Sequence, residues 1–137
     1  MAEGEEMTRP DPLADLKSRF VYTPDKRDRW ALLVASTGPL KGDCEDWAYT
    51  ALWLCAGGSR HRFWGMIWRR EASLWWTRFH GTGGPHVMLF VRGRGWTDSY
   101  YPGWSDHPKH PELRRYGVIK LALTLILKRE RKQNVQG

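Results

Sequence analysis

The stretch Gly42-Asp43-Cys44-Glu45-Asp46-Trp47-Ala48 opens the most strongly predicted helix of the chain. From Cys44 to Ala56 the apolar residues recur at helical spacing, and a pair of glycines ends the pattern. Asp43 is a favourable N-cap residue, and Glu45 and Asp46 place negative charge in the first turn, where the helix dipole favours it. We therefore expect Cys44 at the first position of a helix.

A cysteine at this position is a candidate nucleophile. The unpaired amides of a helix start are expected to lower the pKa of a thiol below its ordinary value of ~8.5. The same amides can bind the oxyanion that forms when a thiolate attacks an amide carbonyl. The competing interpretation of Cys44 is a small buried apolar residue. Cys55 lies roughly 16 Å further along a regular helix, too far for a disulfide, so both thiols are expected to be free, as in a reducing compartment.

A cysteine nucleophile also needs a base and a group that orients the base. His86 follows Gly-Gly-Pro and opens the apolar strand Val87 to Val91, and Asp98 lies in the next predicted strand. If a three-residue loop centred near Gly93 joins these strands, His86 and Asp98 face the same side of the sheet. A two-residue turn would place them on opposite faces.

The other four histidines are weaker candidates for the base. His61, His107 and His110 are expected at the surface, because they lie among arginines or in a Pro-rich loop. His80 lies in an aromatic loop and stays open as an alternative.

The remaining elements are predicted from apolar patterning and turn residues. They are a short helix over 13–20, an apolar segment over 30–34, a strand over 61–70, an irregular aromatic hairpin or loop over 71–84, and a final helix over 113–131. The apolar run of the final helix is shorter than the ~20 residues that span a bilayer. We expect it to dock on the core, with a membrane-surface helix as the alternative.

These elements predict a flexible leader over residues 1–12, one domain over 13–132 that includes the C-terminal helix, and a tail over 133–137. The N-terminus lacks the apolar stretch of a secretory signal and no transmembrane segment is visible. We therefore expect a cytoplasmic protein, or a virion-associated one if the chain derives from a phage.

The composition suggests a binding groove and an anionic partner. Nine Trp in 137 residues exceed what a small core encloses, so some indoles should be half-exposed in a cleft or at an interface. The net charge of +7 suits nucleic acid, lipid headgroups or an acidic polypeptide. The basic run from Lys128 to Lys132 is expected to be solvated surface charge.

The ordered motifs resemble the bacterial transglutaminase-like cysteine proteinases, a branch of the transglutaminase/papain-like superfamily. The similarity spans roughly Phe20 to Tyr101 and lies in Trp30, the Gly42–Ala48 segment, the His86 strand and Asp98. It implies an α+β fold, papain/transglutaminase-like, with the Cys-bearing helix packed on a small antiparallel sheet that carries His and Asp. It also implies a catalytic triad of Cys44, His86 and Asp98.

The resemblance implies two further features. Trp30 would lie close to the nucleophile, near the oxyanion, although a core indole is the equal alternative. Some members bind calcium through acidic residues around the cysteine, here Asp43, Glu45 and Asp46. Helix capping explains the same carboxylates without a metal, and no other cofactor is expected.

The chain also departs from the family. Well-known members carry export signals, and the family often has Asp-Asn where this chain has Asp98-Ser99.

The leading hypothesis is a thiol-dependent amide hydrolase, a cysteine peptidase-like enzyme that acts through an acyl-enzyme on a polypeptide or peptidoglycan-type amide. A transglutaminase or other acyltransferase with the same triad is the first alternative. The second is a non-enzymatic basic, Trp-rich module for binding or virion assembly. Neither the substrate nor the role of the Trp-rich segment over 60–84 follows from the sequence.

Overall fold

The computed structural model describes residues 11–23, 30–34, 37–78, 85–110 and 114–133. Residues 1–10 of the predicted leader, His80 and the tail from residue 134 lie outside the described residues. In chain order the elements are α2 (Ala14–Arg19), β1 (Phe20–Tyr22), β2 (Trp30–Val34), β3 (Leu40–Gly42), α3 (Cys44–Cys55), α4 (Arg60–Trp68), β4 (Ala72–Arg78), β5 (Pro85–Val91), β6 (Gly95–Asp98), β7 (Arg114–Arg115), α5 (Val118–Lys128) and β8 (Arg129–Gln133).

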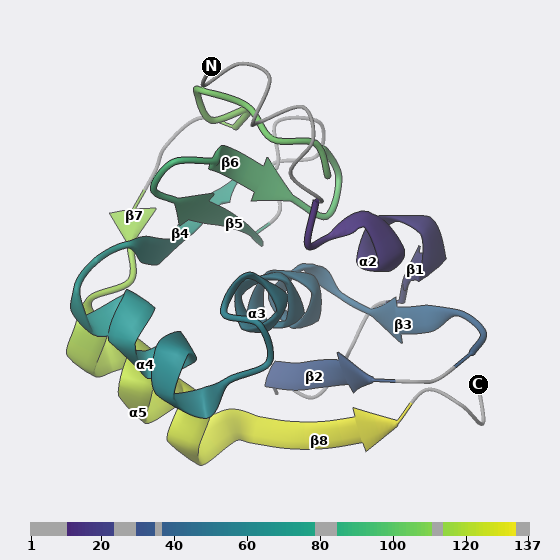
Figure 1. The fold of residues 1–137 in the computed structure, drawn as a ribbon, viewed down its shortest axis with the longest axis horizontal. Helices are drawn as coiled ribbons and strands as arrows, with labels where there is room; N and C mark the ends of the chain where they lie inside the picture. Colours follow the sequence, from purple (N-terminus) through teal and green to yellow (C-terminus); the bar gives the residue numbers. More distant parts are fainter. Residues whose placement is uncertain (1–10, 24–29, 35–36, 79–84, 111–113, 134–137) are drawn as a thin grey trace.

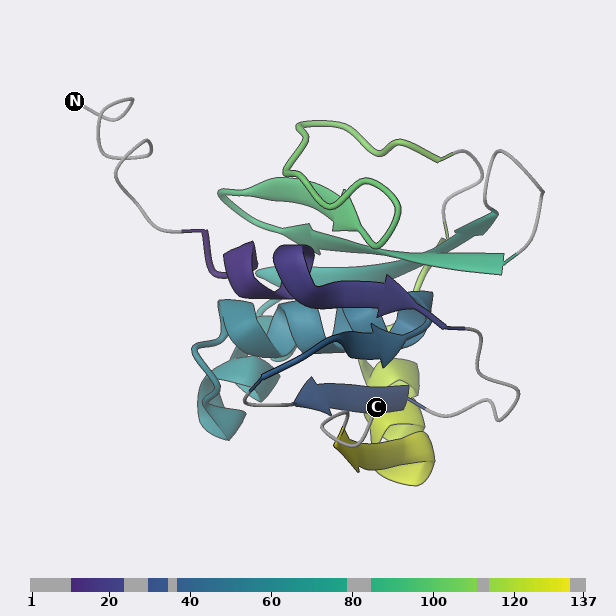
Figure 2. The same ribbon diagram turned by 90° about the vertical axis from the view of Figure 1, so that its right-hand side faces the viewer.

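Helix α3 lies between two sheets (Figure 1 and Figure 2). On one side is an antiparallel sheet with the strand order β6-β5-β4-β7, and on the other is β2, which pairs in parallel with β8. Strand β1 pairs in parallel with β3 beside them. The structure confirms an α+β fold in which the Cys-bearing helix packs on a small antiparallel sheet that carries His and Asp.

The start of α3 is fixed by two carboxylates. Asp43 is the N-cap, and its Oδ1 accepts the N–H groups of Glu45 and Asp46 at 3.1 and 3.0 Å. The fully buried Asp46 accepts the N–H of Asp43 at 3.2 Å and that of Ala31 in β2 at 2.8 Å. Asp46 thus closes a capping box and ties the helix to a neighbouring strand.

Gly42 is required by this arrangement. A Cβ at this position would lie 2.8 Å from both Cβ and Oδ2 of Asp46 and 3.0 Å from Cδ2 of Leu33. The Gly42–Ala48 motif is therefore a packing unit, in which the absence of a side chain at Gly42 makes room for the Asp46 carboxylate.

The β5–β6 hairpin has the loop that was predicted. Val91 pairs with Gly95, which leaves the three-residue loop Arg92-Gly93-Arg94, and Gly93 has the left-handed φ of 88° that such a loop needs. The register pairs Met88 with Asp98. His86 and Asp98 therefore face the same side of the sheet in diagonal positions, as expected for a three-residue loop.

Two predicted elements were wrong. Residues 60–68 form helix α4 and not a strand: Ser59 caps it by accepting the N–H of Arg62, and Phe63, Met66 and Ile67 bury one helical face. The expected irregular segment after it contains the seven-residue strand β4, which pairs with β5 over its whole length. Its many aromatic side chains obscured a simple alternation of buried and more exposed positions.

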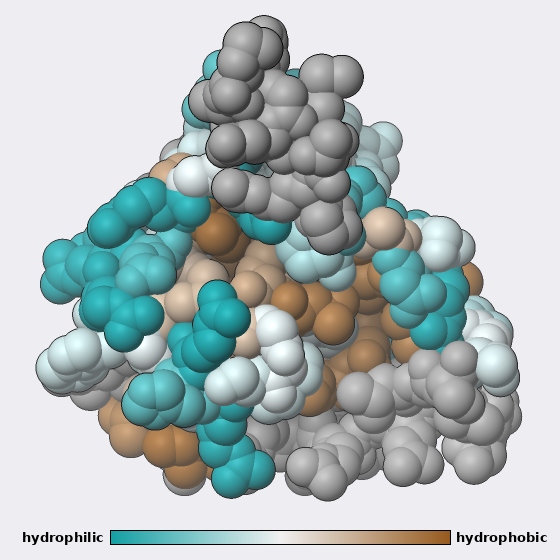
Figure 3. Space-filling view, viewed as in Figure 1, coloured by the Kyte–Doolittle hydropathy of each residue, from teal (hydrophilic) through white to brown (hydrophobic). Residues whose placement is uncertain are grey.

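The final helix is shorter than predicted and continues into β8. Leu121 and Leu125 are buried against the core, whereas Leu123 and Ile126 are exposed, and apolar surface is visible at the α4–α5 corner (Figure 3). Among the described residues, no helix has the length and apolar character needed to cross a membrane. The side chains of the basic run 128–132 lie outside the described part of the chain.

The packing at Gly42 predicts the effect of Gly42→Ala. The added methyl group must displace the Asp46 side chain, so we expect the free energy of unfolding to fall by about 1–3 kcal/mol. Urea unfolding measures this change. Gly103→Ala is the matched control, because a Cβ at Gly103 meets no atom within 4 Å. Equal stability of the two variants would contradict the packing described here.

Candidate active site

Cys44 occupies the first position of α3, as predicted, and only 9% of it is exposed. Its sulfur interacts with the backbone N–H of Val87 in β5. The last β5–β6 pair is Met88 with Asp98, so Val87 lies just beyond the end of the pairing with β6. The thiol therefore contacts the backbone of β5 at this position, one residue after His86.

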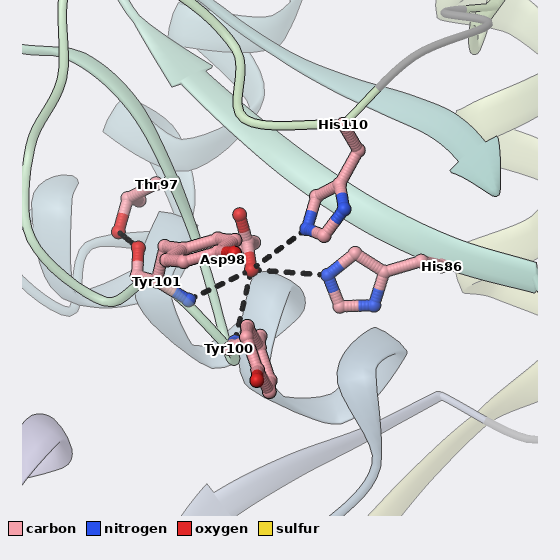
Figure 4. A network of polar contacts seen from close by, with 6 residues as sticks. All are labelled: His86, Thr97, Asp98, Tyr100, Tyr101 and His110. Carbon is pink, nitrogen blue, oxygen red and sulfur yellow. Dashed lines mark hydrogen bonds and ion pairs between the residues drawn. The ribbon is translucent and has the colours of Figure 1, made fainter. Parts of the chain in front are cut away.

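His86 and Asp98 form a buried hydrogen-bonded pair, with His86 Nε2 lying 3.0 Å from Asp98 Oδ1 (Figure 4). The same oxygen accepts the N–H groups of Tyr100 at 2.9 Å and Tyr101 at 3.0 Å. Burial alone would raise the pKa of Asp98, but the hydrogen bonds from His86 and Tyr101 outweigh it and the pKa is lowered. An ionised carboxylate only accepts hydrogen bonds, so the proton in this contact belongs to Nε2 of His86.

His110 completes a cluster that the sequence did not predict. It was expected at the surface, yet it is only 3% exposed, with Nε2 at 3.5 Å from Asp98 Oδ1 and its ring centroid 4.5 Å from that of His86. The loop that follows β6 brings it back over the sheet (Figure 4). No local sequence signal distinguishes His110 from the exposed His107, because only the path of this loop separates them.

The sheet separates this cluster from the side chains that pack on α3. Val87, Leu89 and Val91 belong to the core that also contains α3, so His86 and Asp98 point to the other face of the sheet. The cluster offers three possible metal-ligand atoms within 4.8 Å of one another, one each from His86, Asp98 and His110. Cys44 is not part of that group. The structure therefore joins His86 and Asp98 directly, whereas Cys44 packs on the opposite face of the sheet, where its sulfur interacts with the backbone N–H of Val87.

The pKa of the Cys44 thiol differs from the expectation. Burial and the negative charge of Asp43 raise it to about 12, although the N–H of Val87 acts in the opposite direction. The pKa of Cys55 is also raised, to about 11, by burial. Both cysteines are free, as predicted, but Cys44 rests as a protonated thiol and needs a base to become a nucleophile.

The helix-start amides are less available to an oxyanion than expected, because Asp43 already binds the N–H groups of Glu45 and Asp46. The N–H of Cys44 itself lies beside its own sulfur. Trp30 begins β2, one residue before the Ala31 N–H that donates to Asp46. Its backbone thus lies beside the first turn of α3, while its side chain is outside the described residues.

Tyr22 is a site neighbour that the sequence did not single out. It is 58% exposed and pairs with Gly42 in the β1–β3 sheet. Partial burial and the neighbouring Cys44 and Asp43 raise the pKa of its hydroxyl. The tyrosine is therefore a solvent-exposed neighbour of Cys44.

The calcium candidates serve as structural hydrogen-bond acceptors. Asp43 caps the helix, and Asp46 binds two backbone N–H groups. Among the residues that the structure describes, they do not form a cluster with metal-ligand spacing, whereas His86, Asp98 and His110 do. Calcium binding at Asp43, Glu45 and Asp46 stays a prediction.

No protein-family model, curated protein or solved structure matches this chain.

The cause of the raised Cys44 pKa predicts the effect of Asp43→Asn. Asparagine still caps a helix but removes the charge, so the pKa of the thiol should fall. Each unit of pKa changes the thiolate fraction about tenfold at a pH well below the pKa. We expect severalfold faster alkylation of Cys44 by iodoacetamide at pH 8, measured by intact mass in a Cys55→Ala background.

Glu45→Gln is the control for this prediction, because Glu45 raises the pKa of Cys44 less than Asp43 does. Asp43→Asn should therefore have the larger effect. An unchanged or slower rate in Asp43→Asn would show that its charge does not hold the thiol protonated.

Proposed function

We propose that the chain is a thiol-dependent acyl-transfer enzyme, an amide hydrolase with Cys44 as nucleophile, His86 as base and Asp98 as the group that orients His86. The observation that carries the proposal is the buried 3.0 Å contact between His86 Nε2 and Asp98 Oδ1, beside the strand position that meets the Cys44 sulfur. This contact engages Nε2 with Asp98, so we assign the transfer of the thiol proton to Nδ1, which must reach Cys44 past the end of β6 because the sheet lies between the two side chains.

The proposed reaction begins from a neutral thiol and a neutral imidazole. As the sulfur of Cys44 attacks the carbonyl carbon, its proton moves to Nδ1 of His86, and the ionised Asp98 stabilises the resulting imidazolium. The imidazolium then protonates the leaving amine, and the C–N bond breaks to give a thioester at Cys44. Water, activated by His86, releases the acyl group and restores the thiol.

The raised pKa of Cys44 requires the thiol to lose its proton as the sulfur attacks the carbonyl. With a pKa of about 12, the Cys44 thiol holds almost no thiolate at neutral pH. General-base catalysis by a positioned imidazole contributes typically ~10²–10⁴-fold in rate. His86 is therefore the residue on which turnover should depend most after Cys44.

The arrangement of elements supports a papain/transglutaminase-like assignment. In chain order it has a cysteine at a helix start, a histidine on an antiparallel strand and an aspartate on the neighbouring strand. The family resemblance adds Trp30, whose indole we propose near the oxyanion. The substrate we propose is a polypeptide or peptidoglycan-type amide, and an amine in place of water would make the reaction a transamidation.

The alternative of a basic, Trp-rich binding module stays a prediction. One feature favours an anionic partner: Trp68 is 73% exposed in a groove between α4 and α5 that Arg60 and Arg69 also line. This groove contains none of the triad residues, so binding there would not exclude chemistry at Cys44.

A chromogenic ester tests the proposed reaction. With p-nitrophenyl acetate we expect a burst of one nitrophenolate per chain from acylation of Cys44, lost in Cys44→Ala and at least ~100-fold slower in His86→Ala. Attack by a free thiolate, whose thiol has a pKa of about 12, would give an acylation rate that does not depend on His86.

Cys55→Ala is the matched control, because it removes the other thiol of the same helix and should leave the burst unchanged. A burst that survives in Cys44→Ala, or one that is indifferent to His86, would refute the triad.

A further inference from the structure

We propose that His86, Asp98 and His110 form a binding site for a zinc ion, and that the bound ion switches off the thiol chemistry at Cys44. The binding site stands on the geometry of the cluster alone. The switching rests on the proposed function, because it acts through His86.

The ligand set suits zinc. Two imidazole nitrogens and one carboxylate oxygen are ligands that Zn²⁺ accepts at ~2.0–2.2 Å, usually in a tetrahedral arrangement. Ligand atoms at the corners of such a tetrahedron lie about 3.3 Å apart. Two distances in the cluster, 3.0 Å from Asp98 Oδ1 to His86 Nε2 and 3.5 Å from Asp98 Oδ1 to His110 Nε2, lie on either side of that value.

The positions of the three ligands are also fixed by the surrounding structure. Its ligands come from β5, from β6 and from the loop that follows β6, and all three residues are at most 5% exposed. Backbone N–H groups of Tyr100 and Tyr101 hold the Asp98 carboxylate, as outer-shell donors do in metal sites. Calcium and magnesium, which prefer an all-oxygen shell, fit two imidazoles poorly.

Zinc binding and the proposed catalysis compete for the same imidazole. In the metal-free site Nε2 carries the proton that faces Asp98, which leaves Nδ1 as the base. A metal bound to Nε2 forces the proton of a neutral imidazole onto Nδ1, where it becomes a donor that cannot take the thiol proton. Zinc therefore converts His86 from a base into a metal ligand without occupying Cys44.

The test measures zinc binding to the untagged chain by competition with a chromophoric chelator. We expect one Zn²⁺ per chain, bound at least ~10-fold more weakly by His110→Ala and His110→Gln. His107→Ala is the matched control, because His107 lies in the same loop but is exposed. Cys44→Ala should bind zinc like the wild type, and the Co²⁺-loaded chain should show no thiolate-to-metal charge-transfer band.

Equal binding by the His110 and His107 variants, or binding lost in Cys44→Ala, would overturn the zinc site. Zinc is also expected to abolish the nitrophenolate burst of the wild type and, at the same concentration, to reduce that of His110→Ala much less, each burst being compared with the same variant without zinc. If the site binds zinc and no burst occurs without metal, the proposed enzyme fails while the zinc site stands. A burst that persists in the zinc-loaded wild type would refute the switch.

Discussion

The buried carboxylate of Asp46 is the constraint on which the position of Cys44 depends. It binds the N–H of Asp43 at the start of α3 and the N–H of Ala31 in β2, and it lies over Gly42, where a side chain would collide with it. A buried acceptor that lost these donors would cost about 1–3 kcal/mol per unmade hydrogen bond. The helix start therefore has one location relative to the sheets, and Cys44 is held where its sulfur meets β5.

Asp98 is the buried carboxylate that organises the other face of the antiparallel sheet. Its Oδ1 accepts hydrogen bonds from His86 Nε2 and from the N–H groups of Tyr100 and Tyr101, and His110 Nε2 lies 3.5 Å away. This concentration of donors keeps the carboxylate ionised in spite of burial and fixes which nitrogen of His86 carries the proton. The same feature supports the proposed general base and the proposed zinc site, which is why the two functions exclude each other at His86.

Local sequence patterns predicted the parts of the site that short-range physics determines. The N-cap at Asp43, the place of Cys44 and the same-face relation of His86 and Asp98 follow from capping and from a three-residue loop. Burial of His110 depends on the path of a loop with no periodic pattern, and the raised pKa of Cys44 depends on burial that helix position alone does not reveal. Helix α4 was missed because its aromatic residues resemble those of a strand, although the Ser59 cap was visible.

In the proposed enzyme, Asp98 holds His86 with its proton on Nε2, so that Nδ1 can accept the proton of the Cys44 thiol. Long-range ¹H–¹⁵N NMR correlations of the His86 ring measure this tautomer directly. We expect the Nε2–H form, with an Nδ1 resonance that shifts in Cys44→Ala and stays unchanged in Cys55→Ala. An Nδ1–H tautomer, or an Nδ1 resonance that is indifferent to Cys44, would contradict it.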